Sequence, residues 1–453
     1  MKSMCKNNTY TINVRLIFLL LLAFSFAARG QDKSFRFDFG NGKKKKDFIT
    51  VTASSLYTKA KGFGFLSTNG LQEFDRGGRD PLTTDFITGN QPFYFTVDVP
   101  EGNYNVTVYL GDEQGNSFTT VRAECRRLML EPVTTEQGKV VTREFTVHVR
   151  NKYIAVAGDS VRLKPREFNY FHWDNQLTLE FNGKNPKICG VEILPAKKAT
   201  TIFLAGNSTV VDQAEEPYAA WGQMIPVFFK PEKIAIANYA ESGETLKSFM
   251  GEKRLDKVFT MMKPGDYLFI EFAHNDQKPG GNHLDPFTTY KETLKYFIYE
   301  TRKRQGIPVL VTSMHRRNFD DQRKINNTLG DYPEAVRQTG REEKVPVIDL
   351  NAMSKVLYEA WGPEKSIHAF VHYPAGTFQR QERALSDNTH FNPYGAYELA
   401  KCVVEGIKSN HLAIVDDLTS NLPSFDPTHP DLLENWYWPL SPQKVQSIKP
   451  DGN

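Results

Sequence analysis

The chain has 453 residues, of which 40% are hydrophobic and 24% are charged, a composition typical of folded globular proteins. Its formal net charge of +3 is small for this length and gives no electrostatic reason to expect nucleic-acid binding. The 4 cysteines are too few and too scattered for a disulfide framework, and no Cys-x-x-Cys or His-Glu-x-x-His spacing supports a zinc site. Cys125 and Cys189 either pair or remain free thiols.

The N-terminus has the pattern of an export signal. Basic residues precede an apolar run at Leu16–Phe26, and the small residues Ala28 and Gly30 follow it. The run is too short to span a bilayer, and no second long apolar run follows. We therefore expect residues 1–30 to be a signal peptide and the mature protein to be periplasmic or extracellular, with no integral membrane segment.

Residues 31–197 contain short stretches in which apolar and polar side chains alternate, the pattern of half-buried β-strands. Gly, Pro, Asn or Asp bounds most of these stretches, and no helical periodicity interrupts them. We expect this part to be an all-β sandwich of the jelly-roll type. The predicted strands are Ser34–Phe39, Phe93–Val99, Asn103–Tyr109, Glu144–Val149 and Gln176–Phe181.

Residues 198–410 alternate fully apolar strands with amphipathic helices, which predicts a parallel sheet covered on both faces, an α/β three-layer sandwich. The predicted strands are Thr201–Ala205, Ile234–Asn238, Tyr267–Phe272, Pro308–Thr312 and Val345–Leu350. The predicted helices are Ala219–Lys230, Leu246–Met262, Thr289–Gln305, Asp331–Glu343 and Gly395–Ser409. Residues 411–453, rich in proline and aromatic side chains, are expected to form a strap packed on this α/β domain.

Three residues within the α/β region suggest nucleophilic catalysis. Ser208 follows the first apolar strand, and Asp387 lies three residues before His390 near the end of the domain. A hydroxyl, an imidazole and a carboxylate that orients the imidazole are the minimum equipment for acyl transfer. We predict Ser208 as the nucleophile, His390 as the base, and Asp387 as the residue that orients His390. We also expect a helix to begin just after Ser208, whose dipole would favour developing charge.

Two further residues lie where parallel strands end, at the edge of the sheet where ligands bind. Gly243 follows the second strand and Asn275 follows the third. The backbone N–H groups of Ser208 and Gly243 and the side-chain amide of Asn275 can together stabilise the oxyanion that forms during acyl transfer. We therefore predict that these three residues form an oxyanion hole. The neighbouring Asp276 either orients Asn275 or has a structural role.

These motifs resemble the SGNH (GDSL-like) hydrolase family. The matching blocks are Gly206-Asn207-Ser208, Gly243, Asn275-Asp276 and Asp387-x-x-His390, in the family's order. The flanking sequence is similar to rhamnogalacturonan acetylesterases within that family, at Ala205–Val210, Ala220–Gln223, Phe272–Asp276, Thr312–Arg317, Val345–Leu350 and Asp387–Asn392. The resemblance implies a flavodoxin-like α/β fold and hydrolysis of acetyl esters on a pectic polysaccharide, without a cofactor. Asn207 stands where the family usually has Asp, which keeps an acceptor oxygen. The first domain is similar to galactose-binding-like accessory domains.

Other residues near the predicted site have two possible roles. Arg316 and Arg317 follow the fourth strand and either bind carboxylates of a galacturonate-containing substrate or form surface salt bridges. Trp221 and the tail aromatics Trp436–Trp438 either stack on sugar rings or pack in the interior. The histidines at 274, 283 and 315 lack a metal-ligand spacing, so no metal site is predicted.

The sequence therefore predicts a carbohydrate acetylesterase that uses Ser208, Asp387 and His390. A first alternative is an acetylesterase acting on another glycan such as xylan, or a broader lipase-like esterase, although no long apolar lid segment is apparent. A second alternative is a carbohydrate-binding protein whose hydrolase half is inactive. An acetylated polysaccharide or oligosaccharide is the expected substrate, and the sequence does not decide whether the sandwich binds glycan or only supports the active site.

Overall fold

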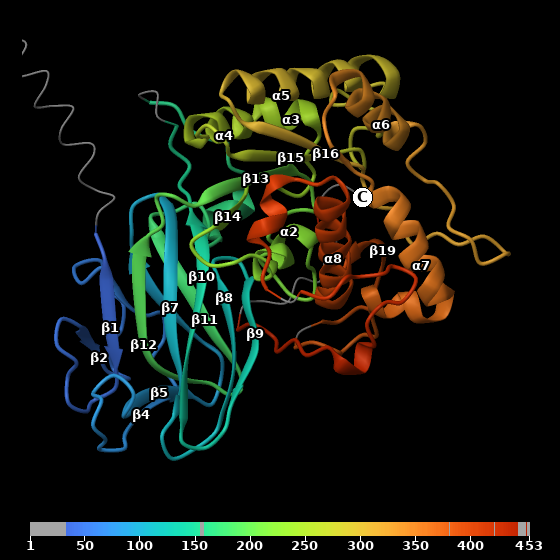
Figure 1. Ribbon diagram of the computed structural model, residues 1–453. Coiled ribbons are helices and arrows are strands. Elements are labelled where there is room, and N and C mark those ends of the chain that lie inside the picture. Colours follow the sequence, from blue (N-terminus) through green and yellow to red (C-terminus); the bar gives the residue numbers. More distant parts are fainter. Residues whose placement is uncertain (1–32, 155–157, 380, 421, 443–449, 451–453) are drawn as a thin grey trace, which may run out of the picture.

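The computed structural model describes residues 33–154, 158–379, 381–420, 422–442 and 450, so the predicted signal peptide lies outside the described residues. A β-sandwich lies beside an α/β sandwich, and the C-terminal segment runs beneath the helices of the second unit (Figure 1). None of the helices in the described part of the chain combines the length and the apolar character needed to cross a membrane.

The first unit consists of two packed sheets that are almost entirely antiparallel. One sheet follows the order β10-β7-β12-β1-β2, with β5 and β4 attached beside β12; the other follows the order β3-β6-β11-β8-β9. The first sheet contains β1 (Phe35–Phe39), β2 (Ile49–Val51), β4 (Leu71–Asp75), β5 (Asp85–Gly89), β7 (Gly102–Asp112), β10 (Lys139–Val149) and β12 (Lys187–Pro195). The second contains β3 (Phe63–Phe65), β6 (Phe93–Asp98), β8 (Ser117–Ala123), β9 (Arg127–Thr135) and β11 (Gln176–Asn185).

Phenylalanine side chains fill the space between the two sheets. Phe37 and Phe39 point inward from β1, and both meet Phe95 of the opposite sheet edge-on, with ring centroids 5.0 and 4.9 Å apart. These three side chains are fully buried. Edge-to-face contacts of this kind add stability beyond the burial of apolar area, typically about 0.5–1.5 kcal/mol per pair. The period-two pattern of the sequence therefore forms a sandwich with one continuous core.

The second unit has a parallel sheet in the order β14-β13-β15-β16-β17, the doubly wound arrangement of flavodoxin-like folds. Its strands are β13 (Thr200–Gly206), β14 (Ile234–Asn238), β15 (Tyr267–Glu271), β16 (Ile307–Val311) and β17 (Val347–Ile348). Strands β14 and β15 lie on opposite sides of β13, so the strand order reverses at β13, and the loops after β13, β14 and β15 meet at one edge. Doubly wound proteins place their ligands at this position.

Alternate residues of β13 face the two helical layers. Ile202 and Leu204 belong to the core beneath one layer, and Phe203 and Ala205 belong to the core beneath the other. The first layer comprises α2 (Trp221–Met224), α7 (Leu350–Ser366) and α8 (Pro393–Ser409). The second comprises α3 (Leu246–Gly251), α4 (Arg254–Met261), α5 (Lys291–Lys303) and α6 (Tyr332–Glu343), and Figure 1 shows it on the other side of the sheet.

Several predicted elements differ from the observed ones. The helix expected at Leu246–Met262 is two helices, because Lys253 adopts a left-handed backbone with φ of 62°. The helix expected at Ala219–Lys230 shortens to one turn of α2 followed by a 3-10 turn at Ile225–Phe228, where Pro226 removes a backbone donor. The last parallel strand has only two residues, since Asp349 caps the unpredicted helix α7.

The C-terminal part crosses both units. An antiparallel hairpin of β18 (Phe370–Tyr373) and β19 (Leu385–Phe391) precedes α8. The tail that follows packs Trp436 on Tyr397 of α8, while the Arg122 guanidinium of the sandwich donates to the carbonyl of Pro439. The tail thus contacts the sandwich as well as the α/β unit on which we expected it to pack. Cys125, Cys189 and Cys402 are buried free thiols, so the first two do not pair.

Candidate active site

Residues that are far apart in the sequence meet at the edge where the parallel strands end. Ser208 lies two residues beyond the end of β13, Gly243 lies beyond β14, and Asn275 lies beyond β15. Strand β19 brings His390 to the same edge. The order of the strands therefore assembles the four blocks that the sequence separates.

Ser208, His390 and Asp387 form a continuous chain of contacts. Nε2 of His390 lies 2.8 Å from Oγ of Ser208, and Nδ1 of His390 lies 2.8 Å from Oδ2 of Asp387. The second carboxylate oxygen of Asp387 accepts the backbone N–H groups of Thr389 and His390 at 2.8 and 3.1 Å. These distances suit proton transfer from the hydroxyl to the imidazole, while the carboxylate fixes the orientation of the ring.

Asp387 is held in its ionised form. Burial opposes its ionisation, but the hydrogen bond and charge of His390, together with the backbone N–H groups, outweigh burial and lower its pKa to about 2. The carboxylate is therefore negatively charged throughout the neutral range. A fixed negative charge beside Nδ1 stabilises the imidazolium that forms when His390 accepts a proton.

The loop carrying Ser208 is a tight turn and not the start of a helix. Oδ1 of Asn207 accepts both the backbone N–H and the hydroxyl of Thr209, at 3.1 and 2.9 Å, so the asparagine supplies the acceptor oxygen expected of it. The next helix, α2, begins only at Trp221. The predicted helix-dipole contribution at Ser208 is therefore wrong, because that effect falls off within one turn.

The loop carrying Gly243 needs glycine and is held by two cations from the sandwich unit. Gly243 has φ of 84°, a left-handed conformation that costs other residues roughly 1–2 kcal/mol. The carbonyl oxygen of Ser242 accepts Nζ of Lys164 at 2.6 Å and a guanidinium nitrogen of Arg166 at 2.8 Å. Since the peptide is planar and trans, holding this carbonyl also fixes the direction of the Gly243 N–H. The proposed oxyanion donor is thus oriented from the first domain.

The same two cations are paired with carboxylates beside the Ser242–Gly243 peptide. Lys164 lies 2.5 Å from a carboxylate oxygen of Glu244, and Arg166 contacts Glu241 at 2.7 Å. Both glutamates are almost completely buried. Burial raises the pKa of Glu241 to about 7, with a further contribution from Glu167. These four side chains hold the loop in place from both ends, and sequence inspection did not find them.

The side chain of Asn275 is fixed by a neighbouring carbonyl. Its Nδ2 donates to the carbonyl of Glu244 at 3.0 Å, which leaves the second amide hydrogen for a ligand. Asp276 instead accepts the backbone N–H of Leu246 at 2.8 Å, at the start of α3. Burial raises the pKa of Asp276 to about 7. Asp276 therefore holds the start of α3. Of the two roles considered for it, orienting Asn275 or a structural role, the structure shows the structural one.

A polar cavity of about 400 Å³ opens beside these donors. Lys164, Gly243, Thr245, Asn275 and Lys278 line it together with residues 279–282. The lining is formed by amide, hydroxyl, ammonium and glycine backbone groups, with Pro279 as its apolar member. Such a cavity suits a hydrated, oxygen-rich ligand better than an alkyl chain.

The sandwich unit also holds the loop that follows Ser208. Two guanidinium nitrogens of Arg127 donate to one carboxylate oxygen of Asp212 at 2.8 and 3.0 Å, with both side chains buried. Arg126 donates to the carbonyl of Gln213, whose side chain donates to the carbonyl of Ser208 at 2.9 Å. Arg126 of the first domain thus reaches Ser208 through Gln213, and Arg127 holds Asp212 in the same loop.

The three residues considered as substrate contacts, Arg316, Arg317 and Trp221, have other partners in the structure. Trp221 is 1% exposed and its indole donates to Glu271 at 2.6 Å, so of the two roles considered for it the structure shows packing in the interior and not a sugar contact. Arg316 donates to the hydroxyl of Thr328 and, at 3.4 Å, to the carbonyl of His274. Arg317 donates to Asn388, the neighbour of Asp387. These half-buried arginines hold loops beside the site, and their contact with substrate stays a prediction.

One group of side chains has the spacing of a metal site. Ligand atoms of Glu167, His172 and Glu241 lie within 4.8 Å of one another. Both oxygens of Glu167, however, accept hydrogen bonds from Arg254 at 3.1 and 2.5 Å. Arg166 adds a second guanidinium at Glu241. Because two guanidinium groups already balance these carboxylates, the chemistry of the cluster is that of a buried ion-pair network.

Comparison with known proteins supports the two-part organisation. Residues 204–397 match the family model described as GDSL-like lipase/acylhydrolase, and residues 35–155 match the galactose-binding-like domain of β-agarase and YXIM esterase. The chain is 43% identical over 226 residues to the rhamnogalacturonan acetylesterase RhgT of Bacillus subtilis, which covers 49% of this chain and 96% of RhgT. It is 34% identical over 224 residues to the probable rhamnogalacturonan acetylesterase YesY of the same organism, covering 49% of this chain and 98% of YesY.

A solved structure was found that covers most of the chain. The crystal structure of YxiM from Bacillus subtilis matches with 24% identity and a TM-score of 0.45, covering 84% of this chain and 99% of YxiM. The family model and the 43% identity to RhgT over nearly its whole length decide the assignment. This chain belongs to the GDSL-like lipase/acylhydrolase family of serine ester hydrolases.

Proposed function

We propose that the protein is an acetylesterase that removes O-acetyl groups from a pectic polysaccharide, rhamnogalacturonan, through an acetyl-enzyme intermediate. The contact of 2.8 Å between Oγ of Ser208 and Nε2 of His390 carries this proposal, because it supplies the base that a serine nucleophile requires. The names of the relatives RhgT and YesY supply the substrate class.

In the acylation half of the proposed mechanism, Oγ of Ser208 attacks the acetyl carbonyl as His390 accepts the hydroxyl proton. The carbonyl oxygen becomes an oxyanion, stabilised by the N–H groups of Ser208 and Gly243 and by the amide of Asn275. The bond between the acetyl carbon and the sugar oxygen then breaks as His390 donates its proton to that oxygen, and the sugar leaves as a free hydroxyl. The acetyl group remains on Ser208 as an ester.

In the deacylation half, a water molecule takes the place of the departed sugar hydroxyl. His390 removes a proton from this water, which attacks the acetyl-enzyme through a second tetrahedral intermediate. Collapse of that intermediate releases acetate and returns the proton to Oγ of Ser208. Asp387 stays ionised in both halves and stabilises the imidazolium each time.

Access to Ser208 favours a short acyl group. The side chain of His390 is 1% exposed and Ser208 is 2% exposed, so little space is open to an acyl chain at the nucleophile. The cavity at Gly243 and Asn275 is lined mainly by polar groups, with no run of Leu, Ile or Phe. These features support an acetylesterase over a long-chain lipase.

The charge of the cavity favours an acidic polysaccharide. Lys164, which is paired with Glu244, and Lys278 line it, and none of the described lining residues is acidic, so the lining itself carries positive charge. A backbone containing galacturonate carries carboxylates, whereas acetylated xylan lacks them in its main chain. We therefore place rhamnogalacturonan ahead of xylan as the substrate, and we propose that export directs the enzyme to such polymers outside the cytoplasm.

The test is acetate release from acetylated rhamnogalacturonan and from acetylated xylan by wild type and Ser208→Ala. We expect faster release from rhamnogalacturonan and a loss of at least about 10³-fold in Ser208→Ala. Preference for xylan would reject the substrate assignment. Equal, measurable rates for the two proteins would reject the mechanism. No acetate release by the wild type would favour a carbohydrate-binding protein with an inactive hydrolase half.

A further inference from the structure

Two tryptophans of the C-terminal tail lie side by side with nearly parallel rings, and the proposed mechanism does not use them. Trp436 and Trp438 are two residues apart in an extended segment, so their side chains lie on the same side of it. Their ring planes differ by 10° and their centroids are 6.2 Å apart. Tyr437, between them, faces the sandwich, where its ring meets Phe118 at 5.0 Å. We call Trp436 and Trp438 the indole pair.

Each member of the indole pair is fixed by neighbours. The guanidinium carbon of Arg122 lies 3.6 Å from the ring centroid of Trp438, a cation–π contact, and the indole N–H donates to Glu216 at 3.0 Å. The ring of Trp436 packs on Tyr397 with centroids 4.7 Å apart. Neither indole has to become ordered when a ligand arrives, so binding costs little side-chain entropy.

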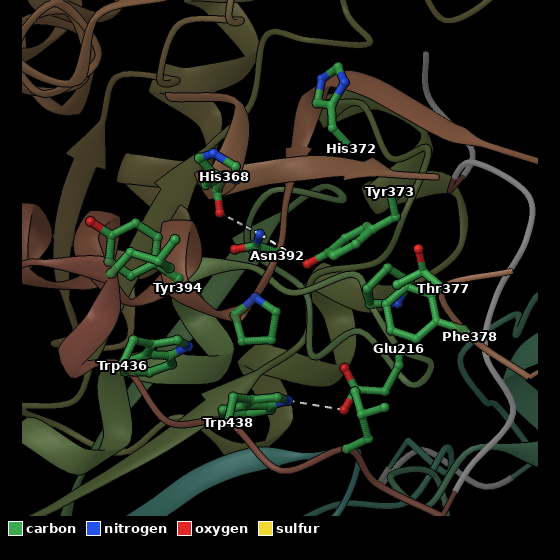
Figure 2. Close-up of a pocket in the computed structure, with 14 residues that line it drawn as sticks. Glu216, His368, His372, Tyr373, Thr377, Phe378, Asn392, Tyr394, Trp436 and Trp438 are labelled. Carbon is green, nitrogen blue, oxygen red and sulfur yellow. Dashed lines mark hydrogen bonds between the residues drawn. The ribbon is translucent and has the colours of Figure 1, made fainter. Parts of the chain in front are cut away.

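The indole pair forms one wall of a cavity of about 360 Å³, shown in Figure 2. Tyr373, Phe378 and Tyr394 contribute further aromatic walls from β18, the loop after it and α8. Polar groups are spaced between the rings: Glu216, His368, His372, Thr377 and Asn392. The cavity falls within the size range of small-molecule sites, roughly 300–1,000 Å³.

The cavity borders the catalytic histidine. Asn392, in its wall, lies two residues after His390. Pro217, also in the wall, precedes Tyr218, whose ring packs edge-on against the imidazole of His390 with centroids 5.8 Å apart. A polymer whose acetyl group reaches Ser208 therefore has this cavity close beside it.

The lining identifies the chemical class of the ligand. A sugar ring has apolar C–H faces and a rim of hydroxyls, which matches flat indoles interrupted by hydroxyl, imidazole and amide groups. Among the described residues that line the cavity there is no lysine or arginine, and the one carboxylate, Glu216, is paired with Arg126. The lining thus favours a neutral sugar, whereas Lys164 and Lys278 line the other cavity.

We propose that the cavity at the indole pair is a subsite for a neutral pyranose ring of the polysaccharide, next to the acetylated residue. This inference rests on the proposed function, since it assigns the ring to the same polymer. In rhamnogalacturonan, neutral and acidic rings alternate, so such a polymer offers a neutral ring for this cavity and an acidic ring for the lysines.

The experiment measures binding by the full chain with Ser208→Ala, which removes turnover. Short deacetylated rhamnogalacturonan oligosaccharides are titrated in a calorimeter, and the indole N–H signals are followed by NMR. We expect the signals of Trp436 and Trp438 to shift, and Trp436→Ala to weaken binding about 5- to 10-fold. Tyr437→Ala, a truncation in the same segment that faces the sandwich, is the matched control and should bind like the parent.

Trp436→Phe is the second variant, because it keeps a ring against Tyr397 if the alanine variant fails to fold. It should weaken binding by a smaller factor. Equal affinities for Trp436→Phe, Tyr437→Ala and the parent, or indole signals that do not move at saturation, would overturn the subsite and leave the indole pair with a packing role. Lack of acetate release from acetylated rhamnogalacturonan by the wild type would instead reject the proposed function.

Discussion

Replacing Lys164 by methionine tests how the first domain supports the oxyanion hole. Lys164→Met keeps most of the side-chain volume but removes one of the two cations at the Ser242 carbonyl. The Gly243 N–H remains present, and Arg166 still donates to that carbonyl at 2.8 Å. The variant therefore loses orientation and polarisation of one donor while the donor itself remains.

The expected decrease in kcat follows from the contribution that one oxyanion donor makes to catalysis. Complete loss of one donor costs about 10²–10³ in kcat, or roughly 2.7–4 kcal/mol. Lys164 provides one of two charge-assisted bonds at the Ser242 carbonyl, so we assign about 1.4 kcal/mol to it, which is a tenfold decrease in kcat. Removing Arg166 as well should bring the decrease in kcat to about 10²-fold, the lower end of that range. KM for a small uncharged ester should change little, because the oxyanion forms only in the transition state.

The assay compares 4-nitrophenyl acetate with its thionoacetate, in which sulfur replaces the carbonyl oxygen. Sulfur accepts hydrogen bonds weakly, so the ratio of kcat/KM for the two substrates reports on the oxyanion donors. We expect this ratio to fall about tenfold in Lys164→Met. Arg162→Met is the matched control, since Arg162 lies in the same segment and donates to the carbonyl of Gly251 instead.

Two results distinguish a role of Lys164 in positioning the Gly243 N–H from a role in stability alone. Loss of Lys164 leaves the buried Glu244 without one partner, so Lys164→Met/Glu244→Gln removes both charges and should recover stability but not the substrate ratio. A ratio in Lys164→Met equal to that of wild type, with both rates lowered together, would refute an oxyanion role for this cation. The sandwich would then support the active site only through stability.

Three other predictions follow from the contacts. Asp387→Asn should lower kcat about 10³–10⁴-fold, because the amide cannot stabilise the imidazolium, and kcat/KM of the wild type should show no titration of Asp387 above about pH 3. Burial raises the pKa of Asp276 to about 7, so its contribution to stability is complete below about pH 4 and is lost as pH rises to about 7. In Asp276→Asn, the free energy of unfolding measured in urea should fall less between about pH 4 and pH 7. An unchanged pH dependence of that free energy would contradict a raised pKa for Asp276. Arg127→Met should destabilise the protein by about 3–5 kcal/mol, because it leaves Asp212 buried without its main partner, and Arg127→Met/Asp212→Asn should unfold at a higher temperature than the single variant.

The sequence was most informative where periodicity or a fixed chemical motif was present. The apolar runs that become β13, β14, β15 and β16 were predicted within one residue at each end, because strands buried on both faces allow no polar interruption. Ser208, Asp387 and His390 were selected by residue type and order. The structure brings them into contact at 2.8 Å.

Elements that depend on local backbone geometry were harder to predict. The left-handed residue Lys253 divides one expected helix, and no residue type at that position indicates it. The expected strand at Val345–Leu350 ends at Ile348 because Asp349 caps α7, and the sequence alone did not show that this aspartate begins a helix. Propensity and periodicity average over such single-residue effects.

The contacts between the two units could not be predicted from the sequence. Lys164 and Arg166 reach a carbonyl 78 and 76 residues away, and Arg127 reaches a carboxylate 85 residues away. Basic side chains of this kind usually lie on the surface, so their burial becomes evident only when the partner is placed. Lys164 and Arg166 hold the loop of Gly243, and Arg127 holds the loop that follows Ser208, so these contacts act on loops that carry proposed catalytic groups.

The most direct test of the central claim is to locate the acetyl group on the enzyme during turnover. The wild type is mixed with 4-nitrophenyl acetate, quenched in acid within the first turnovers and digested for peptide mass spectrometry. The account predicts acetylation of the peptide containing Ser208, on the Ser208 side chain, and no acetylation of that peptide in Ser208→Ala. Acetyl transfer to another residue, or undiminished ester hydrolysis by Ser208→Ala, would contradict it.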